Sequence, residues 1–272
     1  GAGGAAPSGD CSEGQGRCVS TGRELCTGGV FVASACPVQF PTCEEGACIV
    51  RGPPLVSVSN GLFFIDATEV TVAQYAEFVT AKNGDVSGQP ADLCGWNTTY
   101  EPAALANPPE FPASNIDWCD ARAYCEWAGK HLCRSVGSAE PVAYDDLFTT
   151  GVSQWFTACG GPLGAPHVSE NSNDPNLDSS CNANAGTGFL EPVATNSDCE
   201  GYYPGVFDLE GNVAEWVDSC LPSADAGLDS RNDRCMLMGG SIFDFTSFCT
   251  EVYDEYPRDD TASSFGFRCC AG

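Results

Sequence analysis

Apolar residues recur at helical spacing in two segments of the first half of the chain. In the first segment, an apolar run at 62–65 predicts a strand, and Thr71 follows as a helix N-cap with Gln74 at the capping-box position. The apolar face of the helix that begins there consists of Val72, Tyr75, Ala76 and Val79. The sequence Lys-Asn-Gly at 82–84 predicts the end of this helix.

The second segment predicts a helix that starts near Asp117 and ends at Gly129. Its apolar stripe consists of Trp118, Ala121, Tyr124, Cys125 and Ala128. An aromatic stripe at this spacing indicates a core face rather than a cofactor pocket. Beyond residue 130 the periodicity largely disappears, and Gly, Asn, Asp, Ser and Pro dominate from 160 to 205. This composition predicts long loops that are held by disulfides.

Length and charge narrow the class of protein. The 272 residues suit one substantial domain with a small additional module, and a hydrophobic content of 43% is enough for a core. With 37 acidic and 11 basic residues, the net charge is −26, which argues against a nucleic acid or an anionic membrane as partner. The acidity fits either simple solubility or a surface for a cationic partner. No apolar run reaches about 18 residues, so we expect no membrane span.

The cysteines indicate the compartment. There are 18, an even number, and they are spread along the chain. Such usage is typical of a disulfide framework formed in an oxidising space, which predicts an extracellular, secreted or cell-surface protein. A zinc site is disfavoured because the chain has no C-x-x-C spacing and only two histidines, His131 and His167.

Composition also divides the chain into three parts. Residues 1–10 are expected to form a flexible arm of small residues that lies either on its own domain or on a neighbouring subunit, of which we favour the second. Residues 11–50 hold six cysteines, and so short a segment predicts three internal bridges, whose pairing stays open. The sequence Arg-Gly-Pro-Pro at 51–54 predicts a stiff connector, and residues 55–272 form the large domain.

Three motifs in the C-terminal part carry a family resemblance. They are Gly-Asn-x-x-Glu-Trp at 211–216, Gly-Gly-Ser at 239–241 and Gly-Phe-Arg at 266–268. In combination, over roughly residues 60–271, they resemble the formylglycine-generating enzyme (sulfatase-modifying factor) family, in a disulfide-rich secreted subset of bacterial members. The resemblance implies an α+β, C-type-lectin-like fold with little regular secondary structure. One departure is Cys-Arg-Ser at 133–135, where the family continues into a further helix, so the path of residues 133–150 stays open.

The resemblance also implies structural calcium. Carboxylates alternate with backbone carbonyls over 208–215, which suits the flexible oxygen shell of Ca²⁺, although a capped turn with solvated acids is the alternative. By position in the family, the ligands are the side chains of Asp208 and Glu215 and the carbonyls of Gly211 and Val213. A second family site maps to Asn182 and the carbonyls of Ala183 and Phe189, but Thr187 stands where its carboxylate is expected.

The catalytic residues of the family are only partly retained. Its enzymes hold a copper ion with two cysteines, the first three residues after the Gly-Gly-Ser serine and the second five residues later. This chain has Ser241, then Asp244 at the first position and Cys249 at the second. Because Cu(I) prefers thiolates to carboxylates, we expect no copper and treat Ser241, Asp244 and Cys249 as a degenerate site.

The resemblance further implies disulfide partners. In the family, the cysteine after Gly-Phe-Arg bridges to a segment like that at 158–161, so Cys159 is predicted to pair with Cys269 or Cys270, and Cys249 with the other of these two. The remaining candidates for bridges are Cys181, Cys199, Cys220 and Cys235.

Two functions follow as hypotheses. The first is a non-catalytic, calcium-stabilised extracellular binding or assembly protein, with a protein partner or a copy of itself as ligand and carbohydrate as a further possibility. Its expected surface consists of Phe243, Asp244, Phe245, Tyr253, Tyr256 and Arg258, where aromatic and charged residues mix. The second is a divergent formylglycine-generating oxidase that acts on a cysteine of a partner protein.

Overall fold

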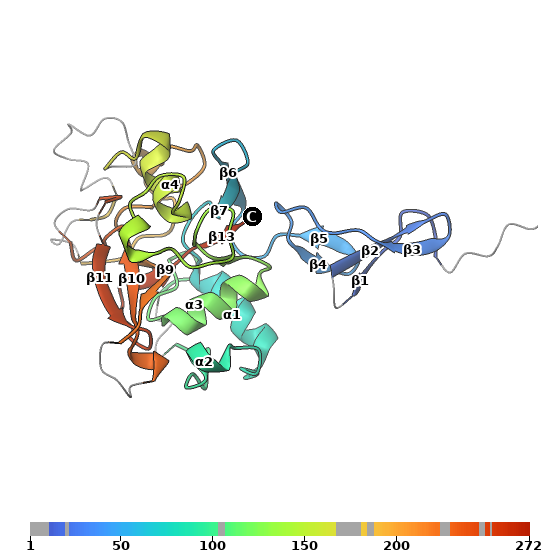
Figure 1. Ribbon diagram of the computed structural model, residues 1–272, viewed down its shortest axis with the longest axis horizontal. Coiled ribbons are helices and arrows are strands. Elements are labelled where there is room, and N and C mark those ends of the chain that lie inside the picture. The colour runs from blue at the N-terminus through green and yellow to red at the C-terminus, as the bar shows by residue number, and fades with distance from the viewer. Residues whose placement is uncertain are drawn as a thin grey trace, which may run out of the picture. The chain divides into compact units, whose positions relative to one another are not determined.

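Two compact units make up the chain, Gly1–Arg51 and Gly52–Gly272 (Figure 1). The computed structural model describes residues 11–19, 22–102, 107–166, 181–183, 188–223, 229–244, 248–250 and 252–272, the side chains of 252–254 excepted. The predicted arm at 1–10 therefore lies outside the described residues. Within the described ranges, none of the helices has the length and apolar character needed to cross a membrane.

The first unit is a small β module. Its strands are β1 (Gly16–Val19), β2 (Gly22–Thr27), β3 (Val30–Ala33), β4 (Thr42–Glu44) and β5 (Ala47–Ile49). An antiparallel sheet of order β1-β2-β3 lies alongside the β4–β5 hairpin. The six cysteines bridge among themselves, in the pairs Cys11–Cys26, Cys18–Cys43 and Cys36–Cys48. These bridges stabilise a segment that is too short to build a large apolar core.

Two four-stranded sheets form the framework of the second unit. Their strands are β6 (Leu55–Val58), β7 (Phe63–Asp66), β8 (His131–Leu132), β9 (Ala214–Leu221), β10 (Arg234–Met238), β11 (Val252–Pro257), β12 (Phe265–Phe267) and β13 (Cys269–Ala271). One sheet has the order β6-β7-β13-β8 and the other β11-β10-β9-β12, in which only the β9–β12 pair is parallel. Since Arg268 alone separates β12 from β13, the end of the chain joins the two sheets.

The described part of this unit also has four α-helices: α1 (Val72–Lys82), α2 (Ala91–Cys94), α3 (Trp118–Trp127) and α4 (Gln154–Gly160). Figure 1 shows α1 and α3 next to each other, and Tyr75 of α1 stacks on Tyr124 of α3 with ring centroids 5.9 Å apart. These rings belong to one apolar core, while Trp155 and Phe156 of α4 lie in a second core with Ile65 of β7.

Helix α1 begins where the sequence predicts. The Thr71 side chain accepts a hydrogen bond from the Gln74 N–H, and the Gln74 side chain accepts one from the Thr71 N–H, which makes a capping box. Asn83 ends the helix in the left-handed conformation. The predicted apolar face is wrong at Ala76, which is exposed; Phe78 is buried instead, because the buried stripe follows a spacing of three residues from Val72.

Regular structure beyond residue 130 is richer than the sequence indicated. Every residue of α4 is buried, so this helix shows no alternation of polar and apolar positions and its amphipathic signal is absent. Strand β9 likewise has buried residues on both faces, from Ala214 to Val217. The sequence thus predicted no element at α4, β9 or β10, whereas the described part of the loops predicted for 160–205 holds, after the end of α4, only two short 3-10 turns, at 161–163 and 197–199.

Disulfides tie the end of the chain to the core. The pairs are Cys94–Cys119, Cys125–Cys269, Cys133–Cys270, Cys159–Cys249, Cys181–Cys199 and Cys220–Cys235. The prediction that Cys159 pairs with Cys269 or Cys270 is thus wrong. Strand β13 lies between β7 and β8, where Cys269 pairs with Cys125 of α3 and Cys270 with Cys133, the residue after β8; the prediction that Cys249 pairs with one of the two is wrong as well, because it pairs with Cys159.

Candidate functional site

The loop that precedes β9 has an unusual backbone. Asp208, Gly211 and Asn212 all have positive φ angles, of 57°, 77° and 53°. A Cβ atom on Gly211 would lie 1.8 Å from the carbonyl oxygen of Cys181, so only glycine fits there. The loop is therefore pressed against residues 181–182, and its polar groups face inward.

Arg268 is the centre of this site. Its Nε donates to both carboxylate oxygens of Glu215 at 2.8 Å, and its Nη2 lies 2.7 Å from Oε1 of the same residue. Its remaining donors reach the backbone carbonyls of Asp66, Phe207 and Asp208 at 2.8–3.2 Å. Arg268 and Glu215 are both fully buried, and we call them, together with Glu69 and Asp208, the Arg268 centre.

The Arg268 centre holds more negative charge than its one arginine balances. Burial raises the pKa of Glu69 well above its ordinary value, and the neighbouring Asp208 raises it further. Burial also raises the pKa of Asp208, although the Ala194 N–H donates to its carboxylate at 2.6 Å. Burial lowers the pKa of Arg268, but the carboxylates of Glu215, Glu69 and Asp208 together outweigh this and the pKa is raised. Glu69 Oε2 has no hydrogen-bond donor among the described residues.

The four calcium ligands expected here do not behave alike. Asp208, together with Glu69, which is not among the four, offers buried carboxyl oxygens whose pKa burial raises; a hard cation would favour their ionised form. Glu215 is already occupied: besides Arg268, the Trp155 indole Nε1 donates to its Oε2 at 2.7 Å. A calcium ion on Glu215 would have to lie against the guanidinium, so the donor set fits calcium on the Asp208 and Glu69 side of the centre.

The second expected calcium set does not fit. The side-chain amide of Asn182 donates to the Phe189 carbonyl at 3.2 Å and to Asn212 Oδ1 at 3.0 Å. One of the expected oxygen ligands is thus already bonded to another, and Thr187 lies outside the described residues. Asn212 in turn donates to Glu69 Oε1 at 3.0 Å, which links this polar cluster to the Arg268 centre.

Asp244 serves as the cap of a tight turn. Its Oδ2 accepts hydrogen bonds from the Ser241 N–H at 2.7 Å and from the Ser241 hydroxyl at 3.0 Å. The Ser241 Oγ also accepts from the Phe243 N–H at 3.3 Å. Burial raises the pKa of Asp244, and the two bonds from Ser241 oppose this. Both side chains are thus engaged in local structure.

Cys249 has no free thiol, because it forms a disulfide with Cys159 of α4. Both residues are fully buried. The Cys249 N–H donates to Glu210 Oε1 at 3.0 Å, and the two sulfurs and this carboxylate lie within 4.8 Å of one another. Disulfide sulfurs are not thiolates and do not ligate a metal as thiolates do, so this group is a structural contact.

A cavity of about 390 Å³ lies beside the Ser241–Asp244 turn. Its lining includes Asn115, Phe189, Leu190, Ile242 and Ser263. Phe189 is 80% exposed and Phe243, next to Ile242, is 50% exposed. Phe189 lines this cavity, whose walls are partly polar and partly apolar, and Phe243 directly follows the lining residue Ile242; we call the two exposed rings and the cavity the Phe189–Phe243 face.

The predicted binding surface is only partly present. Arg258 is 3% exposed, so its assignment to an exposed surface is wrong: its guanidinium packs over the Trp118 ring, 4.5 Å from the centroid. Tyr256 is half-buried against Phe265. Phe245 and the side chain of Tyr253 lie outside the described residues.

The family profile described as "Sulfatase-modifying factor enzyme 1-like domain" matches residues 25–271. The chain belongs to this family. The predicted α+β fold is confirmed, with two sheets and few helices in the domain. The family match begins inside the first unit, further towards the N-terminus than the sequence motifs indicated.

Relatives in the sulfatase-modifying factor family include enzymes and proteins named as inactive. The inactive C-alpha-formylglycine-generating enzyme 2 of Bos taurus is 28% identical over 67% of this chain, which spans 58% of that protein's length. The formylglycine-generating enzyme of Thermomonospora curvata is 26% identical, over 93% of this chain and 94% of its own. Among solved structures, CarF is 18% identical with a TM-score of 0.49, over 77% of this chain and 85% of its own. Family membership alone therefore does not decide whether this chain is an enzyme.

Sequence reasoning missed two residues of the site. Glu69 lies in the turn before α1 and accepts a hydrogen bond from Asn212, which is 143 positions later in the chain. Trp155 is on α4, the helix without an amphipathic pattern. Their roles depend on contacts between distant segments, which a local pattern does not contain.

Proposed function

We propose that this protein is a non-catalytic extracellular binding module, built on a sulfatase-modifying factor domain and stabilised by calcium. The observation that carries the proposal is the state of the degenerate site. Asp244 stands where the family has a copper-binding cysteine, and Cys249 is bonded to Cys159. A two-thiolate Cu(I) site needs both sulfurs free, and this chain supplies neither. The nine disulfides, with no free cysteine, support an oxidising and hence extracellular location.

Binding is assigned to the Phe189–Phe243 face. Exposed aromatic rings beside a cavity of mixed polar and apolar lining are typical of protein interfaces, in which a few aromatic side chains supply most of the affinity. The ligand is a protein, either a different chain or a second copy of this one. The rigid core behind the face, fixed by the Cys159–Cys249 bridge and the Ser241–Asp244 turn, keeps the surface in one conformation.

Calcium would be held by Asp208 and Glu69, with backbone carbonyls of the 208–213 loop completing the oxygen shell. When bound, the ion supplies positive charge that neutralises carboxylates left unbalanced by Arg268. Arg268 and Trp155 hold Glu215 in place, and Asn212 holds Glu69, so these side chains orient the carboxylates of the centre. The ion's role is structural, because the loop has little secondary structure of its own.

The test of the non-catalytic assignment is an oxidase assay. The purified protein with all disulfides intact is supplied with copper, oxygen, a reductant and a Cys-x-Pro-x-Arg peptide, and the peptide is analysed by mass spectrometry. We expect no formylglycine. Formylglycine at a rate comparable to a family enzyme assayed in parallel would instead establish the divergent oxidase.

Calcium is tested separately by thermal unfolding. The melting temperature of the wild-type protein should rise when millimolar-range calcium replaces a chelator, by mass action on the folded state. The Asp208→Asn variant should lose this rise, whereas Asp145→Asn, which changes an exposed carboxylate, should keep it. An equal rise in both variants would show that Asp208 does not bind the ion.

The binding face is tested with a Phe189→Ser/Phe243→Ser variant. Static light scattering of wild type and variant shows whether the face joins two copies of the chain. Cross-linking to extracellular proteins of the source organism shows whether it binds a different chain. A variant that keeps its melting temperature and every interaction of the wild type would refute the assignment.

A further inference from the structure

A second cavity, of about 240 Å³, lies between α3, α2 and the end of β9. Its lining includes Leu93, Trp118, Arg122, Asp218, Asp233 and Arg258. The volume is several times that of a single water in the liquid and below the range of most drug-sized sites, so it suits a small organic molecule. Its walls carry both signs of charge over an apolar floor. The family's degenerate site has no residue in common with it.

Arg258 enters this cavity with unsatisfied donors. The residue is 3% exposed, and its Nη2 donates to Asp233 Oδ2 at 3.0 Å. Its Nε and Nη1 are buried and have no hydrogen-bond partner among the described residues. Most N–H groups of this guanidinium therefore lack an acceptor, and buried donors without acceptors are unfavourable. A ligand oxygen that accepted hydrogen bonds from them would remove this penalty. Stacking on Trp118, at 4.5 Å, fixes its plane.

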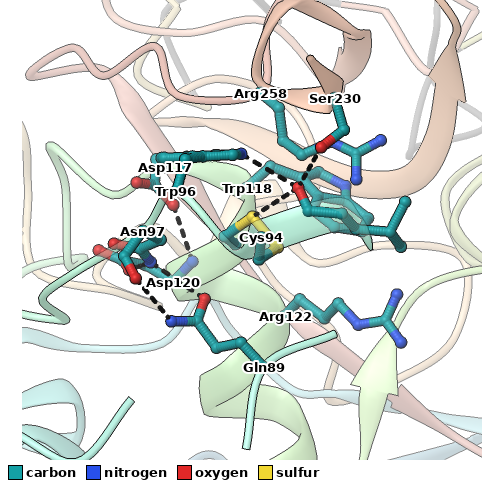
Figure 2. The surroundings of a disulfide bond; sticks show 12 residues. Gln89, Cys94, Trp96, Asn97, Asp117, Trp118, Asp120, Arg122, Ser230 and Arg258 are labelled. Carbon is teal, nitrogen blue, oxygen red and sulfur yellow. Dashed lines mark hydrogen bonds between the residues drawn. A yellow bond between two sulfur atoms is a disulfide. The ribbon is translucent and has the colours of Figure 1, made fainter. Parts of the chain in front are cut away.

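Arg122 and Asp218 supply the other charges. The Arg122 guanidinium lies 5.5 Å from the Trp118 centroid, and Figure 2 shows Arg122 and Arg258 at either side of Trp118 with both guanidinium groups directed to the same side of the view. Burial raises the pKa of Asp218, which the nearby arginines oppose. Its backbone is anchored by bonds with Cys133 and Val142. Arg122 Nε donates to Glu126 Oε1 at 2.9 Å, and Asp233 pairs with Arg258. The cavity thus offers the remaining donors of two arginines and, of its two carboxylates, Asp218 as the one without an ion pair among the described residues.

Two disulfides hold the walls in place. Cys94 follows Leu93, Cys119 follows Trp118, and the two cysteines are bonded to each other (Figure 2). Cys220 lines the cavity and is bonded to Cys235 on the neighbouring strand. The Leu93 carbonyl also accepts a hydrogen bond from the Ser230 hydroxyl at 2.9 Å, and the Trp118 indole donates to Val217. A site fixed in this way loses little freedom when a ligand binds.

We propose that this cavity binds a free α-amino acid, with the ligand carboxylate on Arg258 and Arg122, the ligand ammonium on Asp218, and its side chain against Leu93 and Trp118. A zwitterion matches both signs of the wall. It also carries no net charge, so the overall charge of −26, which repels simple anions, opposes its approach little. A simple cation would find the two arginines against it.

The experiment is a thermal-shift screen of the intact protein with each standard L-α-amino acid, followed by calorimetry on the one with the largest shift. At about 10 mM, the screen responds to dissociation constants of millimolar or below. We expect one amino acid, or a few of similar side chain, to raise the melting temperature and to bind with one-to-one stoichiometry. If no amino acid raises it, the proposal is wrong.

Variants and derivatives of the bound amino acid test the chemistry. Asp218→Asn keeps the shape of the side chain but removes the charge that holds the ammonium, and binding should weaken at least about tenfold without loss of stability. Arg258→Lys should weaken it by a similar factor, whereas the surface variant Asp145→Asn should bind as the wild type does. The N-acetyl and the carboxamide derivatives should each bind at least about tenfold more weakly. Equal binding of the N-acetyl derivative would overturn the proposal in favour of a simple anion site.

Discussion

Two buried arginines in this domain have opposite surroundings. Every nitrogen of Arg268 has an acceptor, from Glu215 or from a backbone carbonyl. Arg258 is almost as deeply buried, but only its Nη2 has one, at Asp233. The chain supplies acceptors for all nitrogens of Arg268, whereas it leaves two nitrogens of Arg258 without one among the described residues. A buried guanidinium that lacks hydrogen-bond acceptors indicates a place for a ligand, whereas one with all its acceptors indicates a structural role.

The carboxylates of the two regions differ in the same sense. Glu215 is paired with Arg268 in the Arg268 centre. Asp117 and Asp120, next to Trp118, form no ion pair among the described residues. The Asn97 amide donates to Asp120 at 2.6 Å, and Asp117 caps α3 through the Asp120 N–H at 2.8 Å (Figure 2). Burial raises the pKa of Asp117 to about 7 and that of Asp120 well above its ordinary value. The contrast predicts different responses to substitution and to pH.

Removal of Arg268 should have the largest effect on the free energy of unfolding. Arg268→Met leaves Glu215, Glu69 and Asp208 buried without a cation, so the free energy of unfolding should fall by about 3–5 kcal/mol. Urea unfolding at neutral pH, with the disulfides intact, measures the loss. A loss below about 1 kcal/mol would show that Arg268 is not the group that balances this centre.

The pH dependence of the Trp118 region comes next. The pKa of Asp117 is about 7 in the folded protein and about 3.9 in an unfolded chain, so between these values only the folded state keeps the proton. Its contribution to stability is therefore present at low pH and is lost as the pH rises towards 7, at up to about 1.4 kcal/mol per pH unit. Asp117→Asn keeps the helix cap and should flatten this part of the curve. Identical curves for wild type and variant, in urea titrations from about pH 4 to about pH 7, would contradict the assignment.

Removal of Arg258 should destabilise the protein less than removal of Arg268. Arg258→Met loses one ion pair and the stacking on Trp118, but Asp233 keeps its bond from the Ser223 N–H and is 19% exposed, so water can solvate it. The unpartnered N–H groups disappear as well, which offsets part of the loss. We expect about 1–2 kcal/mol by urea unfolding, clearly below the effect of Arg268→Met. The reverse order would break the comparison between the two arginines.

The smallest effect on the free energy of unfolding is expected at an exposed ion pair. Arg234 lies 3.6 Å from Glu255, and the two side chains are 48% and 38% exposed. Arg234→Gln should change the free energy of unfolding by less than about 1 kcal/mol, because water and salt screen the pair. A larger loss in the same urea assay would mean that the other values also contain contributions unrelated to burial.

Local signals in the sequence predicted the amphipathic parts of the fold. Helix α1 buries one face and α3 buries most of its surface, but both carry an apolar stripe at helical spacing and begin at a capping residue, Thr71 and Asp117, so periodicity and caps located both. Helix α4 and strand β9 are buried all round, which removes the alternation that sequence reasoning needs. Disulfide pairing failed for a related reason: Cys159 and Cys249 are 90 residues apart, and only the packing of α4 brings them together.

The candidate site, like the fold, was predictable only where its residues belong to local sequence motifs. Asp208, Glu215 and Arg268 belong to motifs that are visible in the sequence, and the structure brings them to one centre. Glu69 and Trp155 join them from distant segments. Arg258 was misplaced because a charged residue after an edge strand looks exposed in sequence; its burial depends on Trp118, which is 140 positions earlier and reaches it only in the folded chain.

The central claim, that this chain has no two-thiolate copper site, is tested most directly by Cu(I) binding. Wild type is compared with Asp244→Cys/Cys159→Ser, which frees Cys249 and restores a cysteine at position 244, in titrations against a chromogenic Cu(I) chelator. The wild type should leave all of the copper with the chelator, and the double variant should withdraw one equivalent. Tight Cu(I) binding by the wild-type protein, with its disulfides intact, would contradict the account.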